Sequence, residues 1–232
     1  MAEIFPNAPL KSAAFEIRFP GELSIEAKRY EFQDKIRDKY PKLYVPNVQE
    51  GTSPALQPYT FRNEEETKNL RIAVNSFSAV TSQYDGFADF KAEFLSFFEL
   101  FQGLFNIQKL TRTGLRYTNH IPIFRDNSVI PFSEYLNVRF QTPDEISEDC
   151  EELTFASTRR LGDGKLRCLI QHQIELPEGK EILLLDFDYF LTGDLSPARI
   201  SDYLDVSHRH TKQTFTTLLT ENYTSIMRGE TQ

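Results

Sequence analysis

Two aspartates, Asp186 and Asp188, stand two residues apart in the apolar segment LLLDFDYF. On a β-strand, side chains two positions apart point to the same side of the sheet, about 7 Å from each other. Paired carboxylates can bind a divalent cation or act as an acid and a base. A metal site would need a third acidic or histidine ligand, and the sequence pattern does not show which residue would supply it. We therefore assign no catalytic residue, no cofactor and no metal.

Arginines also recur inside segments that alternate as strands do. Strand parity puts five arginines opposite the apolar side chains of their own segments: Arg18, Arg71, Arg112, Arg116 and Arg167. One interpretation is an exposed sheet with cross-strand ion pairs, each worth under about 1 kcal/mol. The other is a polar surface on which arginines bind a partner or an anionic ligand as bidentate donors. The candidate partner- or ligand-binding residues are Arg18, Arg71, Arg116, Asn119, Asp186, Asp188 and His208.

The histidines are weaker indications of a binding or catalytic site than the aspartates and arginines. His172 interrupts an apolar strand face and His208 lies in the inner stripe of the last helix, positions typical of a buried histidine with a satisfied ring. His208 and His210 are two apart on a helix and point in different directions, so they cannot both bind one ion. A metal-dependent nuclease using Asp186, Asp188 and a histidine stays open as one hypothesis.

Motifs of common enzyme classes do not occur. There is no GxxxxGK[ST] or GxGxxG loop, and the GDG segment at 162–164 is typical of a hairpin turn. No GxSxG elbow is present, and Cys150 and Cys168 lie in no nucleophile signature. These absences favour a non-enzymatic function.

Composition limits the partners. The chain of 232 residues has a net charge of −8, which disfavours nucleic acid because phosphate backbones attract basic surfaces. MAEIFPNAPL lacks the features of a signal peptide, and no apolar stretch reaches the length of about 18 residues that spans a bilayer. We expect a cytoplasmic protein without membrane contact that binds a protein partner or itself.

Apolar periodicity predicts the elements. The spacing of seven phenylalanines predicts a helix over 87–105 with one aromatic face. Ser196 and Pro197 mark the start of a last helix, with a break near Asp205. The other predicted elements are strands at 15–19, 43–50, 59–62, 70–84, 110–123, 152–160, 165–176 and 181–191, a helix at 24–40 and a short helix at 131–140.

The order of these elements repeats. FEIRF at 15–19 corresponds to TGLRY at 113–117, with arginine in the same place. We therefore predict an α+β fold of two related β-α-βββ-α halves, 1–107 and 108–232, that form one compact unit. The sheets are expected to be antiparallel, with the long amphipathic helices packed on one face. An acidic loop at 142–152 distinguishes the second half.

Three blocks carry a resemblance to a known family: PNAPLKSAAFEIRF, GLRYTNHI, and LLLDFDYF followed by DVSHRHTKQTFTTLLTENY. Together they resemble a sporadically distributed bacterial protein family of unassigned function. Such a distribution implies horizontal transfer, so the resemblance implies a phage-defence, toxin–antitoxin or mobile-element locus. It supplies no catalytic residues.

The leading hypothesis is a non-enzymatic recognition protein that binds a protein partner through the polar sheet face or between the halves. Replacing Arg18 and Arg116 together would then abolish partner capture without changing the melting temperature. An alternative is a small-ligand-binding protein with an apolar cavity under the Phe-rich helix. This alternative requires a cavity of a few hundred cubic ångströms.

Overall fold

The computed structural model describes residues 5–45, 57–125, 129–138, 151–175 and 179–230. The first half of the chain contains β1 (Leu10–Arg18), α1 (Ser24–Ile36), β2 (Lys42–Tyr44), β3 (Tyr59–Arg62), β4 (Lys68–Ala73), β5 (Ser76–Thr81) and α2 (Phe87–Phe105). The second half contains β6 (Leu110–Pro122), α3 (Phe132–Tyr135), β7 (Thr154–Leu161), β8 (Gly164–Glu175), β9 (Lys180–Leu195), a 3₁₀ turn (Pro197–Arg199), α4 (Ile200–Leu218) and α5 (Glu221–Arg228).

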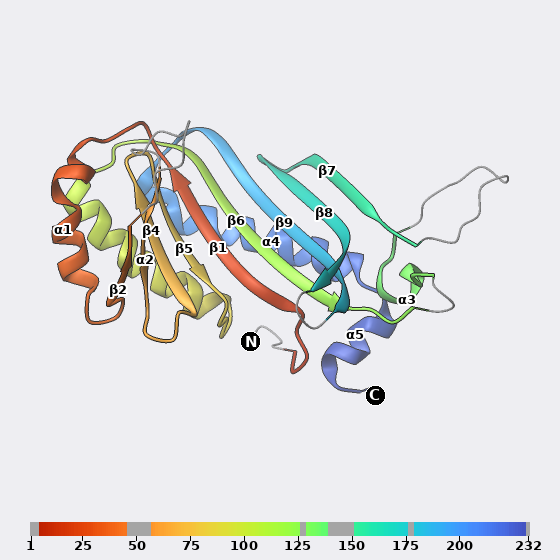
Figure 1. Ribbon diagram of the computed structural model, residues 1–232. Coiled ribbons are helices and arrows are strands. Elements are labelled where there is room, and N and C mark those ends of the chain that lie inside the picture. Colours follow the sequence, from red (N-terminus) through yellow and green to blue (C-terminus); the bar gives the residue numbers. More distant parts are fainter. Residues whose placement is uncertain (1–4, 46–56, 126–128, 139–150, 176–178, 231–232) are drawn as a thin grey trace.

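Nine strands form one antiparallel sheet in the order β2-β3-β4-β5-β1-β6-β9-β8-β7 (Figure 1). The two halves meet at its centre, where β1 pairs with β6 and Glu16 faces Gly114. In each half the first strand pairs with the last, β1 with β5 and β6 with β9. Glu16 and Gly114 hold the same place in the FEIRF and TGLRY motifs. This correspondence is topological, and the internal duplication stays a prediction.

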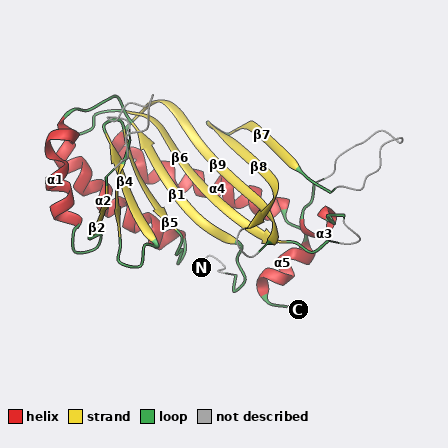
Figure 2. Cartoon of the chain, in the orientation of Figure 1, coloured by secondary structure: helices red, strands yellow, loops and turns green. Residues whose placement is uncertain are grey.

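The helices α2 and α4 lie on one face of the sheet (Figures 1 and 2). Helix α2 contacts both α1 and α4, and α4 lies on the central strands β6 and β9. The predicted α+β class, the antiparallel pairing and the packing of the long helices on one face are confirmed. No helix in the described ranges is long and apolar enough to cross a membrane.

The core lies between the sheet and these helices and is rich in phenylalanine. Six of the seven predicted phenylalanines of α2 are buried, and Phe87 at its first position is half-buried. Phe101 stacks on Phe77 of β5 at 4.7 Å, and Phe94 meets Phe15 of β1 edge to face at 4.8 Å. Such ring pairs add to the free energy gained by burying apolar surface. The Phe-rich face therefore serves mainly to hold α2 on the sheet.

The prediction of one strand over 70–84 is wrong. The chain turns at Val74 and Asn75, and the two-residue turn joins β4 to β5 with Ala73 facing Ser76. Asn75 is a typical turn residue, but the apolar alternation continues on both sides of it and conceals the hairpin.

The predicted break near Asp205 is also wrong. Helix α4 runs without interruption from Ile200 to Leu218, and the break comes later, at Thr220. The Thr220 side chain accepts a hydrogen bond from the Tyr223 backbone amide and so caps α5.

Other boundaries need smaller corrections. Helix α1 ends at Ile36 rather than at 40, and the short helix predicted at 131–140 is the four-residue α3. Most of the predicted strand at 43–50 and of the acidic loop at 142–152 lies outside the described residues.

Candidate functional site

The candidate residues chosen from the sequence divide between the two faces of the sheet. Cross-strand pairing places Arg18, Arg71, Arg116, Asp186 and Asp188 on the face opposite α2 and α4, hereafter the open face. The other two residues, Asn119 on β6 and His208 on α4, lie on the helix-covered side, where they line one cavity. The candidates therefore form two separate sites.

Arg116 and Asp186 form the best-defined ion pair of the open face. The Arg116 Nε and Nη2 atoms each donate a hydrogen bond of 2.7 Å to a different oxygen of the Asp186 carboxylate. The Asp186 side chain is 8% exposed, whereas that of Arg116 is 58% exposed. The hydrogen bond to Asp186 raises the pKa of the Arg116 guanidinium.

Arg112, absent from the candidate residues, connects the remaining carboxylates. Its Nη2 donates to Asp188 at 2.7 Å and its Nη1 to Glu16 at 3.3 Å. Glu16 also accepts a hydrogen bond from Arg18 at 2.6 Å. The Arg112 guanidinium lies across Gly114, where a Cβ atom would come within 2.6 Å of it. Arg112 and Arg116 are separated by an even number of residues on one strand, so strand parity places both side chains on the same face.

These contacts account for the aspartates without a metal. Burial raises the pKa of the Asp188 carboxyl, and the nearby Arg112 and Arg116 guanidinium groups oppose that rise. Among the described residues, no group of three or more His, Cys, Asp or Glu side chains is placed to hold a metal ion. His208 lies on the other side of the sheet from Asp186 and Asp188, so it does not supply the histidine of the nuclease hypothesis.

A cavity of about 410 Å³ lies on the helix-covered side. It is formed by the N-terminal segment, the chain entering α2, strands β6 and β9, and the second half of α4. Its apolar lining comes from Phe5, Pro6, Ala8, Pro9, Leu10, Phe87, Phe187 and Phe215. Its polar lining includes Tyr84, Tyr117, Asn119, His208, Thr211 and Lys212.

A chain of hydrogen bonds crosses one wall of this cavity. The Tyr84 and Tyr117 hydroxyls are 3.0 Å apart, and the Tyr117 hydroxyl is 3.0 Å from His208 Nδ1. The His208 ring stacks on Phe87 with centroids 3.8 Å apart and planes 4° apart. The segment between β5 and α2, strand β6, the start of α2 and the middle of α4 therefore position these four rings together.

Burial keeps three polar groups of the cavity wall uncharged, those of Tyr84, Tyr117 and His208. It lowers the pKa of His208 to about 4, with a smaller effect of the Lys212 charge. It also raises the pKa values of the Tyr84 and Tyr117 hydroxyls. At neutral pH the wall therefore presents neutral donors and acceptors next to apolar rings.

Two further residues complete the polar part. Asn119 is buried and its side-chain amide donates to the Leu185 carbonyl at 3.2 Å. Lys212 is exposed, and no carboxylate in the described part of the chain pairs with its ammonium group. Tyr84, Tyr117 and Phe87 were absent from the candidate residues because their meeting depends on strand and helix packing.

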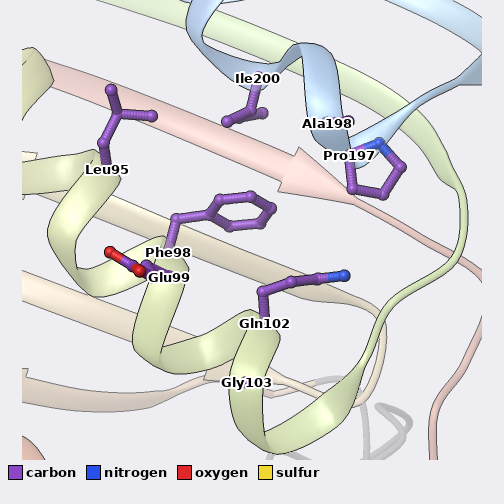
Figure 3. A pocket seen from close by; sticks show the side chains of 8 residues that line it. All are labelled: Leu95, Phe98, Glu99, Gln102, Gly103, Pro197, Ala198 and Ile200. Carbon is purple, nitrogen blue, oxygen red and sulfur yellow. The ribbon is translucent and has the colours of Figure 1, made fainter.

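A second hollow lies between α2 and the start of α4 (Figure 3). Its volume is about 580 Å³, but it is a groove widely open to solvent. Leu95, Phe98 and Ile200 form its apolar floor, and Gln102 at its edge donates to the Ile107 carbonyl at 2.7 Å. It lacks the converging polar groups of the cavity around His208, so we regard that cavity as the better binding site.

Comparison with protein-family models and with curated proteins finds no match for this chain. The resemblance seen in the sequence therefore stays an expectation.

Proposed function

We propose that the protein binds a small ligand in the cavity of about 410 Å³ between the sheet, the start of α2 and α4. The observation that carries this proposal is the combination of an apolar lining with the hydrogen-bond chain from Tyr84 through Tyr117 to His208. Ligand sites in proteins typically have this size, with mainly apolar walls and a few polar groups that orient the ligand.

The lining indicates the class of ligand. The aromatic and proline side chains suit an apolar body, and the neutral tyrosine and histidine groups suit one hydroxyl, carbonyl or ring nitrogen of the ligand. Lys212 at the rim adds a positive charge that favours an acidic end. We therefore favour a mainly apolar molecule with one polar or acidic end.

This proposal places the small-ligand hypothesis ahead of a protein partner on the polar sheet face. The central arginines of that face already have carboxylate partners within the chain, so their donors are partly occupied. The cavity lies at the first turn of the Phe-rich helix rather than beneath its length. The expected cytoplasmic location and defence context stay predictions.

The test uses 1-anilinonaphthalene-8-sulfonate, an apolar probe with an acidic end, and its fluorescence on titration with the full chain. Ala8→Trp adds a large side chain at the cavity wall and is expected to weaken binding at least about tenfold, by steric exclusion. The matched control is Ala88→Trp, since Ala88 is exposed on α2 and does not line the cavity. Equal affinity in both variants would refute the proposal.

A second measurement identifies the natural ligand. Native mass spectrometry of the protein purified from its source cells should show a bound small molecule that is lost in Ala8→Trp but kept in Ala88→Trp. Tyr117→Phe should weaken retention, because it removes the hydroxyl between Tyr84 and His208. Unchanged retention in Tyr117→Phe would mean that the hydrogen-bond chain does not contribute to ligand binding.

A further inference from the structure

The open face is basic although the whole chain is acidic. Among the paired strand positions of this face, ten side chains are basic and four are acidic. The basic ones are Arg18, Lys42, Arg62, Arg71, Arg112, Arg116, Arg160, Lys165, Arg167 and Lys180, and the acidic ones are Glu16, Glu175, Asp186 and Asp188. The face therefore has an excess of positive charge in a chain whose net charge is −8.

Many of the acidic side chains that the structure describes lie off this face, among them Asp34 on α1 and Asp202 and Asp205 on α4. A partner that approaches the open face meets the local field rather than the average charge of the chain, because salt screens charges beyond about 8 Å. The net charge is thus a poor guide to what this face attracts.

The positive excess is concentrated on one wing of the face, formed by β7 and β8. Arg160 lies opposite Lys165 in the register of these strands, and Arg167 follows on the same side of β8. All three side chains are exposed, and no carboxylate of the described residues forms an ion pair with them. By contrast, at the other end of the sheet Glu64 and Glu66 form ion pairs with Lys42, and Glu66 also pairs with Arg62.

We infer that the open face binds the phosphate backbone of a nucleic acid, with Arg160, Lys165 and Arg167 as its main contacts. Seven of the ten basic side chains are arginines, whose planar fork matches phosphate oxygens better than a lysine ammonium does.

The size of the face fits the same partner. From Arg71 on β4 to Arg160 on β7 the face crosses six interstrand spacings, about 29 Å along the sheet. No described helix covers this surface (Figure 1). An extended backbone can therefore lie across the strands and meet Arg71 on one side and the β7–β8 wing on the other.

Fluorescence anisotropy with labelled oligonucleotides of about 20 nucleotides tests the inference at about 50 mM salt. Single-stranded DNA, duplex DNA and RNA are titrated separately. We expect the wild-type chain to bind at least one of them with a micromolar dissociation constant. Arg160→Glu/Arg167→Glu should weaken binding at least about tenfold. It should also reduce the magnitude of the slope of log binding constant against log salt concentration by about 2, because two phosphate contacts are lost.

The control is Lys28→Glu/Lys35→Glu, which makes the same change in net charge on exposed positions of α1. It should bind as the wild type does. An equal loss in the control, or no binding of any oligonucleotide to the wild type, would overturn the inference. If the wing variant instead loses binding to a polyglutamate peptide while no nucleic acid binds, the partner is an acidic protein. Circular dichroism spectra confirm that both variants fold, and the result is independent of the ligand cavity.

Discussion

Arg116 illustrates how one residue can serve both stability and recognition. Its guanidinium satisfies both oxygens of the buried Asp186, yet more than half of its own side chain is exposed. Arg71 lies three strands away on the same face, and within the described ranges its only side-chain hydrogen-bond partner is the Asn69 side-chain oxygen at 3.2 Å. The arginines selected by strand parity are thus energetically unequal, although their sequence contexts look alike.

Replacing Arg116 by glutamine is expected to reduce the free energy of unfolding by about 1 to 3 kcal/mol. The substitution leaves the Asp186 carboxylate buried without its cation, and the exposure of Arg116 keeps the cost below that of a fully buried pair. Urea unfolding measures this change, with Arg71→Gln as the control expected within about 0.5 kcal/mol of the wild type. The same small effect in both variants would mean that the pair does not stabilise the fold.

His208 should make stability depend on pH. Its pKa is about 4 in the folded chain against an ordinary value of 6.5, so the unfolded chain binds more protons between these values. Stability is therefore fully present above pH 6.5 and falls as the pH decreases towards 4. We expect His208 to contribute a loss of about 1 kcal/mol between pH 6.5 and about 5, after allowing for the partial exposure of the ring.

The measurement compares urea unfolding of the wild type and His208→Gln across this range. The variant keeps a polar group near Tyr117 but cannot take up a proton, so its stability should fall less on acidification. Parallel curves for both proteins would show that His208 is not held in its neutral form by the fold.

Among the secondary-structure elements, helix α2 was the easiest to predict. Its packing explains why. Its phenylalanines recur at three- and four-residue steps, and the buried ones meet rings from α1, β1 and β5. The β4–β5 hairpin is the opposite case, since its apolar alternation continues through a two-residue turn. Periodicity identifies an element but not a reversal of direction within it.

Phe101→Ala is expected to destabilise the protein by about 3 to 5 kcal/mol. The Phe101 ring is fully buried and has four ring neighbours, including Phe77 at 4.7 Å and Phe105 at 4.9 Å. Thermal and urea unfolding give the magnitude. The control is Phe124→Ala, whose ring is 79% exposed, with an expected change of less than about 0.5 kcal/mol. Similar losses at both positions would contradict the assigned core.

For the whole molecule, the continuous sheet joins the two halves through the β1–β6 pair. Both strands lie in the interior of the sheet order, so separating the halves would expose two long strand edges and part of the core. The halves 1–107 and 108–232 therefore share one sheet and one hydrophobic cluster.

We expect the chain to unfold in a single cooperative transition. Differential scanning calorimetry should give equal calorimetric and van't Hoff enthalpies, and the urea transitions followed by circular dichroism and by tyrosine fluorescence should coincide. Two resolved transitions would mean that each half is stable alone and that the β1–β6 pair contributes little.

The α+β class, the Phe-rich helix and the side of each strand on which Arg18, Arg116 and Asp186 lie could all be predicted from the amino-acid sequence. These features are local, because side-chain direction along a strand or helix follows from backbone geometry alone. Which strands are neighbours became known only from the folded chain. That order brings His208, Tyr117 and Tyr84 together around a cavity and gathers basic side chains on the open face. Neighbours in a sheet depend on packing between distant segments, which no local pattern encodes.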